Sequence, residues 1–236
     1  MSGPARARLS LLEALLAFAV LLLAIVSGCA QPAGGAFAWA KKKPKNEPVG
    51  IRTVAQQLEE LQATQKNAKS MSADQQTQAL VDLKERMANE ADSTVRIQIM
   101  HTAGAIPSAL AAEVINAGLE DSQADVRIAA CDAWGKRGGA DSVQHLSRVL
   151  GSDTDIDVRM AATRALGETK DKGAIPALGE ALADSDPALQ FRAMQSMRNV
   201  SGREFGNDIT AWREYAKNAS TAPGPGLAER VRALWY

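Results

Sequence analysis

Cysteine and histidine are scarce in this sequence, which has only two of each among 236 residues. The histidines, His101 and His145, lie far apart, and neither has a Cys or His beside it at the spacing of metal ligands. The sequence also lacks a glycine-rich phosphate loop, a nucleophile elbow and a haem-attachment motif. We therefore expect no metal site, no cofactor and no catalytic residue.

Aromatic residues and net charge are low as well. Aromatics make up 4% of the chain and hydrophobic residues 46%, so a core must consist largely of Ala, Leu, Val, Ile and Met, as close-packed helices allow. The 27 basic and 27 acidic residues balance, whereas binding of nucleic acid usually requires a concentrated basic face. The sequence predicts no nucleic-acid partner and one domain with accessory segments.

One short pattern, built around Val-Arg followed by small and apolar residues, occurs four times. Successive copies begin 31, 32 and 31 residues apart. Self-similarity at this period is typical of a solenoid, in which each unit buries its apolar face against its neighbours. In the last copy Gln190 replaces the arginine, which leaves open whether this copy is a full unit or the beginning of a cap. The copies are residues 95–104, 126–135, 158–167 and 189–198.

Each copy predicts a helix, because its apolar residues recur at spacings of three and four. An Asp or Gln three residues before each copy, and Pro187 before the last, are helix start signals. Gly104, Gly135 and Gly167 close the first three copies, and we expect them to end these helices in the left-handed conformation. An amphipathic helix at 51–66 is predicted to cover the open end of the stack. A second helical pattern occupies residues 79–87, 107–119, 143–150 and 175–182. The prediction is an all-α solenoid of about four antiparallel helix pairs.

The pattern resembles the HEAT-like repeats first associated with phycobilisome lyases, whose core combines Asp, Val-Arg, Ala-Ala and Ala-Leu-Gly. Residues 157–167 match this core well, and residues 125–135 match it closely. Ile106-Pro107 and Ile175-Pro176 are similar to the opening of the family's first helix. The resemblance covers about residues 78–198, roughly half of the chain. It implies an α-solenoid that serves mostly as a scaffold and only occasionally as part of a lyase.

Arginine recurs at the same point of three copies, as Arg96, Arg127 and Arg159, and Asp125 and Asp157 stand two positions before the last two of these arginines. One interpretation is a ladder that faces an anionic ligand along a groove. The alternative is a structural ladder, in which each arginine pairs with an acidic side chain or carbonyl of the neighbouring repeat and keeps the stack in register. We favour the structural ladder.

The N-terminus resembles a bacterial lipoprotein signal peptide. Arg6 and Arg8 precede an apolar run at residues 14–26, which is short for a membrane-spanning helix. Residues 26–29, Val-Ser-Gly-Cys, are similar to the lipobox. By that resemblance the mature protein begins at Cys29, which carries acyl chains such as palmitate that hold it on a membrane. An ordinary signal peptide and an uncleaved anchor are the alternatives. No Asp follows the cysteine, which favours the outer membrane where a cell has two.

Composition divides the chain into four segments. Residues 1–28 are the predicted signal peptide, and residues 29–50 are a tether rich in Lys, Pro and Gly. The lysines of Lys41–Lys45 either contact anionic lipid or wall polymer, or simply belong to a solvated linker. Residues 51–218 are the repeat domain. Residues 219–236 are a linker and a short basic and apolar tail, which either folds back or docks onto a partner.

Cys131 is the only thiol left once Cys29 is acylated, so no intramolecular disulfide is expected. It aligns with Thr163 of the next copy, inside a predicted helix. A small packed residue is therefore favoured over a nucleophile.

Residues 202–218 are predicted to cap the C-terminal end of the stack. Asp208 is the expected helix cap, and Trp212 and Tyr215 lie three apart on one helical face. The aromatic pair either binds a ligand or plugs the last hydrophobic groove, and we favour the plug because large rings bury the most surface. The cap residues are Phe205, Asp208, Trp212 and Tyr215.

Two functions of different classes fit these observations. The first is a lipid-anchored scaffold that presents a groove to a protein or extended peptide in the bacterial cell envelope. The second is an enzyme or enzyme accessory akin to the bilin lyases, for which the sequence offers no named residue. We favour the scaffold, because an exported protein is separated from the cytosol, where bilin attachment takes place.

Overall fold

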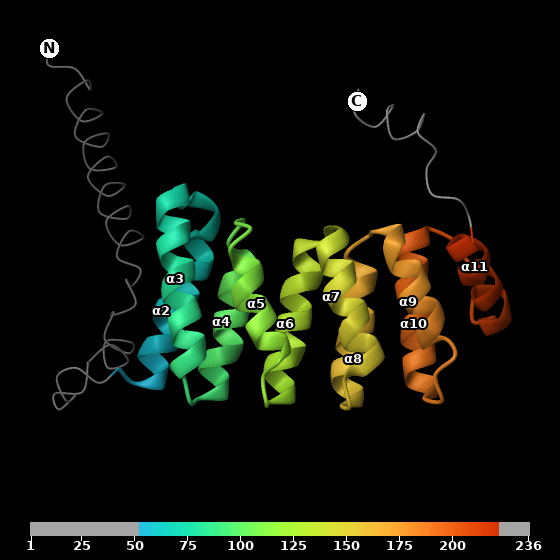
Figure 1. Cartoon of the computed structure of the whole chain (residues 1–236), viewed down its shortest axis with the longest axis horizontal. Helices are drawn as coiled ribbons and strands as arrows, with labels where there is room; N and C mark the ends of the chain where they lie inside the picture. The colour runs from blue at the N-terminus through green and yellow to red at the C-terminus, as the bar shows by residue number, and fades with distance from the viewer. Residues whose placement is uncertain (1–51, 222–236) are drawn as a thin grey trace, which may run out of the picture. The chain divides into compact units, whose positions relative to one another are not determined.

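The computed structural model describes residues 52–221, and within this range it contains ten α-helices, two short 3-10 helices and no strand (Figure 1). The predicted all-α solenoid is thereby confirmed. The helices are α2 (Val54–Asn67), α3 (Ala73–Asn89), α4 (Ser93–Ala105), α5 (Ala111–Leu119), α6 (Ala124–Arg137), α7 (Gly139–Ser152), α8 (Ile156–Glu168), α9 (Ile175–Ala181), α10 (Pro187–Ser201) and α11 (Ile209–Thr221). The predictions for residues 1–28, 29–50 and 222–236 lie outside the described residues.

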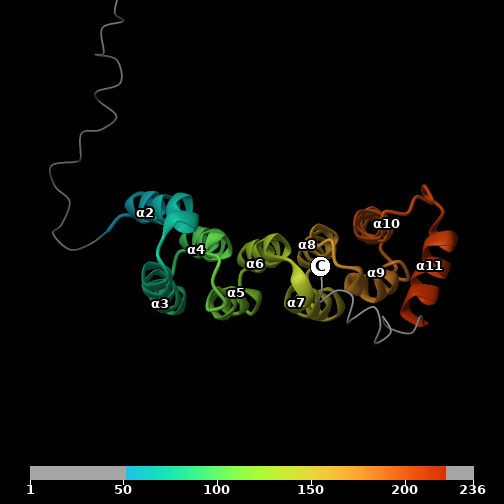
Figure 2. The same ribbon diagram turned by 90° about the horizontal axis from the view of Figure 1, so that it is seen from above.

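The helices form two layers (Figure 2). The first layer holds α2, α4, α6, α8 and α10, and its last four members are the four copies of the repeated pattern. The second layer holds α3, α5, α7 and α9. The copy at 189–198 therefore belongs to a full helix pair, α9 and α10, which settles the question that Gln190 left open. At the end of the stack α11 packs against α9 and α10.

Aspartate side chains start three of the first-layer helices. The Oδ1 atom of Asp92 accepts a hydrogen bond from the backbone N–H of Thr94 at 2.8 Å, and Asp155 and Asp186 do the same in α8 and α10. Each carboxylate satisfies backbone donors that the first turn of a helix leaves unpaired. These start signals are confirmed, although Gln123 makes no such bond before α6.

The glycines that close the first three copies do not end their helices, so this part of the prediction is wrong. Gly104, Gly135 and Gly167 lie inside α4, α6 and α8, and none has a positive φ. A Cβ built on Gly167 would stand 2.8 Å from the Cα of Ser196 in α10. These residues are glycine because the next first-layer helix passes too close for any side chain. The left-handed cap of α10 is Gly202, with φ of 67°.

Several helices are longer than their hydrophobic pattern indicates. Helix α3 begins at Ala73 rather than at residue 79, because Ser72 and Gln75 form a capping box ahead of it. Helix α5, in contrast, begins four residues later than predicted, at Ala111. Polar end groups thus set boundaries that apolar periodicity does not reveal.

The core of residues 52–221 is aliphatic, as the low aromatic content predicts. Its members are mainly Ala, Leu, Ile, Val and Met, joined by the buried rings of Trp134 and Trp212. Within the described range, no helix combines the length and the apolar character that crossing a membrane requires.

Candidate functional site

Arg96 joins two consecutive inter-helix loops. Its Nε and Nη2 atoms donate to the two carboxylate oxygens of Asp121, at 2.7 and 2.9 Å, and its Nη1 atom donates to the carbonyls of Glu90 and Ala91. Glu90 and Ala91 precede α4, whereas Asp121 precedes α6. The guanidinium therefore joins the loop before α4 to the loop before α6.

The same bonds recur along the stack. Arg127 donates to both oxygens of Asp153, at 2.8 and 3.0 Å, and Arg159 donates to Asp184 at 2.8 Å. In the last unit Gln190 keeps one of the contacts, since its Nε2 atom donates to the carbonyl of residue 184. We call this series the ladder; it comprises Arg96, Arg127 and Arg159 with Asp121, Asp153 and Asp184.

The aspartates of the ladder are held as carboxylates. Burial opposes the ionisation of Asp121 most strongly, but hydrogen bonds from Arg96 and from the backbone N–H of Gln123 outweigh it and lower the pKa. The same causes lower the pKa of Asp153. Only 11% of the Arg96 side chain and 7% of the Asp121 side chain are exposed. The guanidinium groups are thus paired with protein carboxylates, and the exposed fraction of the arginine side chain rises from 11% at Arg96 to 26% at Arg159.

The aspartates that the sequence pairs with these arginines lie elsewhere. Asp125 and Asp157 are exposed in the first turns of α6 and α8, and no hydrogen bond or ion pair of their side chains is found within residues 52–221. The true partners, 25 or 26 residues beyond each arginine, were missed. Their signal was available in the sequence, because Asp121, Asp153 and Asp184 repeat at the same period as the arginines.

A second series of equivalent residues in the first layer is only partly buried, at the edge of the core. Each directly follows the arginine or glutamine of its copy, so the four occupy the same position of the successive first-layer helices α4, α6, α8 and α10. Three are half-buried and Phe191 is 47% exposed. We call this line the apolar row; it comprises Ile97, Ile128, Met160 and Phe191.

Charged side chains flank the apolar row on both sides. Asp125 and Asp157 lie three residues before Ile128 and Met160, which places them beside the row on the same helices. One turn further along the helices, Arg164 forms an ion pair with Asp132, which links α8 to α6. The row is thus bordered by free carboxylates on one side and by a neutralised pair on the other.

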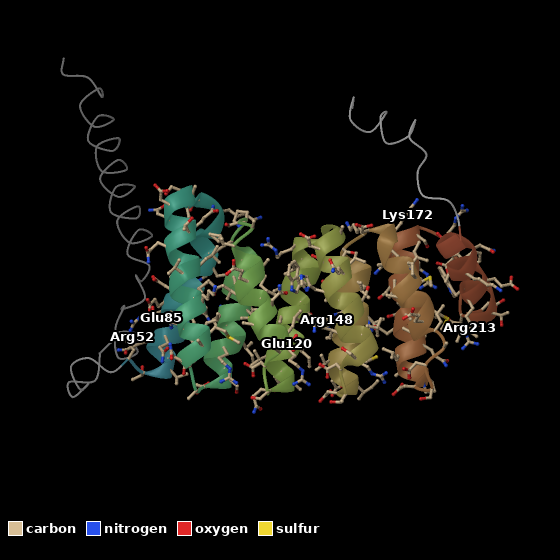
Figure 3. The ribbon with its side chains drawn as sticks, viewed as in Figure 1. Arg52, Glu85, Glu120, Arg148, Lys172 and Arg213 are labelled. Carbon is tan, nitrogen blue, oxygen red and sulfur yellow. The ribbon has the colours of Figure 1, made fainter. Side chains whose placement is uncertain are left out.

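The exposed edge of the second layer carries ion pairs of another kind. Arg148 of α7 reaches Glu120, just after α5, at 2.8 Å, and both side chains are more than half exposed (Figure 3). At the N-terminal end, a groove of about 580 Å³ lies between α2 and α3, with Leu61, Leu83 and Arg86 among its lining residues. The groove is lined by polar and apolar groups alike.

Aromatic side chains close the C-terminal end. Trp212 is fully buried, its Nε1 atom donates to the carbonyl of Gly206, and its ring meets that of Phe205 edge-on with centroids 4.8 Å apart. Tyr215 packs beside both rings. Asp208 accepts from the backbone at the start of α11. Helix α11 thereby covers α9, and Arg213 donates two hydrogen bonds to the carbonyl of Leu182, directly after α9 (Figure 3).

The thiol and the imidazoles lie within the helical packing. Burial raises the pKa of Cys131 to about 12, so the thiol stays protonated. Burial lowers the pKa of His101 and of His145, and the His145 ring stacks on Trp134 with centroids 4.6 Å apart. Within residues 52–221 no three His, Cys, Asp or Glu side chains are placed to hold a metal ion.

Stacked helix pairs joined by a repeating polar ladder define an α-solenoid. The family model of the HEAT repeats matches residues 80–167 and 148–208, and the chain belongs to this family. The match is to HEAT repeats in general and does not single out the phycobilisome-lyase type. Repeats of this family commonly mediate the binding of protein partners, which makes the chain a protein-interaction scaffold. A search of curated proteins found no match.

Proposed function

We propose that this protein is a membrane-anchored lipoprotein whose HEAT-repeat scaffold binds a protein partner in the bacterial cell envelope through the apolar row. The single observation that carries the proposal is the row itself. Four apolar side chains at the same position of successive first-layer helices remain partly exposed. The apolar residues two positions before them, Val95, Val126, Val158 and Leu189, are fully buried. A row of partly exposed apolar side chains is typical of a surface that binds another protein.

The ladder supports the same function in a different way. Its arginines are paired with Asp121, Asp153 and Asp184, so they fix the spacing of the helices that carry the row and are neutralised by protein carboxylates. The row is therefore held on rigid elements, and a partner that fits it loses little free energy to reorganisation of the scaffold.

Photo-crosslinking in the living cell tests the docking face. A benzoylphenylalanine in place of Met160 should form a discrete adduct with a partner protein. The same group at Gln144, exposed on α7 in the second layer, is the control and should give none. Adduct formation at position 160 should disappear when Ile128 is also changed to Asp. Equal adducts at both positions, or none at either, would rule out this face as the docking site.

The anchor is proposed from Val26-Ser27-Gly28-Cys29 and has its own test. Mass spectrometry of the purified N-terminus should find Cys29 as the first residue, carrying the mass of two or three acyl chains. The Cys29→Ala variant should lack that mass and leave the membrane fraction, since several buried chains are needed for stable attachment. An unmodified Cys29 in membrane-bound protein would refute the lipoprotein assignment.

A further inference from the structure

We infer that the apolar row binds the C-terminal tail, residues 227–236, of a second copy of this chain. This inference rests on the proposed function insofar as it uses the same face of the first layer. It goes further by naming the occupant, its chemistry and the molecule from which it comes.

The surroundings of the row define the charge of its occupant. The loops and first turns at residues 90–96, 120–127, 152–159 and 183–190 contain ten carboxylates. Four of them, Asp121, Asp153, Asp184 and Glu120, form ion pairs with arginines, which leaves an excess of six negative charges. Asp125 and Asp157, beside the row, are exposed and without a partner in the described part of the chain. A segment that covers Ile128 and Met160 must therefore be apolar on one side and carry a positive charge next to it.

The tail has this composition. Leu227, Val231 and Leu234 are spaced as one stripe of a helix, and Arg230 falls at the border of that stripe. Seven residues of helix rise about 10.5 Å, close to the ~8–10 Å that separates packed helix axes. Leu227 and Leu234 of a helical tail would thus meet two consecutive members of the row, with Arg230 within reach of Asp125 or Asp157. Trp235 adds an aromatic anchor of the kind that dominates interface energies.

The linker before the tail is too short to reach the row of the same molecule. Helix α11 begins beside the first layer and ends beside the second (Figure 2). The linker at 222–226 spans at most about 18 Å when fully extended. Two helix layers are already about 20 Å thick, and the row lies in the first layer. The occupant must therefore come from a second copy, as a heterologous contact between molecules.

A crosslinking experiment with the full chain in detergent tests this. Protein carrying benzoylphenylalanine in place of Trp235 is mixed in equal amounts from ¹⁴N and ¹⁵N cultures and irradiated. We expect crosslinked peptides that join the tail to α4, α6, α8 or α10. About half of them should join a ¹⁴N peptide to a ¹⁵N peptide, because copies from the two cultures pair at random. Pairs of uniform label only, crosslinks to another surface, or no crosslinks would overturn the inference.

Charge variants supply the control. Asp125→Lys with Asp157→Lys should lower the crosslink yield about tenfold, because Arg230 then meets like charge. Asp74→Lys changes the same second helical position of α3, in the other layer, and should leave the yield unchanged. Circular dichroism melting of each variant checks that it is folded. Equal loss in both variants would contradict the proposed charge pairing.

The two proposals can fail separately. If position 160 captures another envelope protein while Trp235 gives no mixed-label crosslinks, the tail inference is wrong and the proposed function stands. If the mixed-label crosslinks form but position 160 captures only a second copy of this chain, the inference stands and the proposed foreign partner is refuted.

Discussion

Arg96 and Arg127 each bind one carboxylate and two backbone carbonyls. Arg127 donates to both carboxylate oxygens of Asp153 and to the carbonyl of Asp121. Taking such a pair out of water costs about as much free energy as its attraction returns, so its main contribution is to fix geometry rather than to add net stability. The ladder thus sets the register between neighbouring repeats.

Removal of one partner is therefore expected to cost more than removal of both. Arg127→Ala should lower the free energy of unfolding by about 3 kcal/mol, because Asp153 is left charged and only 10% exposed. Arg127→Met combined with Asp153→Leu should recover most of this loss. The control is Arg148→Ala, whose pair with Glu120 is exposed and worth about 0–1 kcal/mol. Urea titrations measure all three, and equal costs for the two alanine variants would contradict this account.

The sequence predicted the arginines of the ladder but not their partners. Asp125 and Asp157 were attractive because they stand two positions before an arginine. Residues two apart on a helix point to different sides, however, so those carboxylates face solvent beside the apolar row. The partner comes from the next loop, and only the packing of one repeat on another brings it within 3 Å.

At the scale of the helices, glycines determine how closely consecutive first-layer helices approach one another. A Cβ on Gly135 would meet the Cα of Ala165 at 3.0 Å, and one on Gly167 would meet the Cα of Ser196 at 2.8 Å. The obstructing atoms belong to backbone, which cannot rotate away. Consecutive first-layer helices therefore touch backbone to backbone.

This contact makes a single methyl group costly. Gly167→Ala should lower the free energy of unfolding by about 1–3 kcal/mol, because α8 and α10 must separate. Gly151→Ala is the matched control, since nothing lies within 4 Å of its Cβ position near the end of α7. There the gain in helix propensity should stabilise the protein by about 0.5–1 kcal/mol. Thermal melting compares them, and a shift in the same direction for both would show that helix contact does not decide the outcome.

Sequence periodicity located every helix pair but assigned these glycines a different role. A glycine at the end of an apolar pattern is equally compatible with a left-handed cap and with close approach of another helix. The choice depends on the position of the neighbouring helix. Likewise, the capping box of Ser72 and Gln75 extended α3 beyond its apolar pattern.

At the scale of the whole molecule, the ladder couples stability to pH. The pKa values of Asp121, Asp153 and Asp184 are all lowered in the folded protein. For Asp184 the first cause is the hydrogen bond from the backbone N–H of Asp186. A carboxylate with a depressed folded pKa contributes stability that is present above its unfolded pKa, ordinarily 3.8, and is lost as pH falls through the folded value.

The protein should therefore unfold in acid. We expect the urea midpoint to change little between pH 7 and 5 and to fall steeply below about pH 4, as the ladder carboxylates become protonated. Asp121→Asn with Asp153→Asn should be less stable at pH 7 and show a shallower acid slope. A midpoint that stayed constant to pH 3, or an unchanged slope in the double variant, would exclude the ladder as the cause.

The overall architecture is the level at which the sequence was most informative. A pattern that recurs every 31 or 32 residues predicts stacking of equivalent helix pairs, and the structure confirms it. The apolar row escaped notice because Ile97, Ile128 and Met160 look like ordinary core positions in a helical pattern. They are partly exposed because they lie at the edge of the apolar side that each first-layer helix packs against the second layer.

Uniform spacing of the ladder has an implication for how such a chain lengthens or shortens. The bond from each arginine to the following loop is nearly the same at every junction, so the face that one unit offers matches the face that the next requires. Duplication or excision of a whole unit in the gene would rejoin compatible surfaces without any new contact having to arise. A single genetic event can thus change the number of repeats and, with it, the length of the binding face.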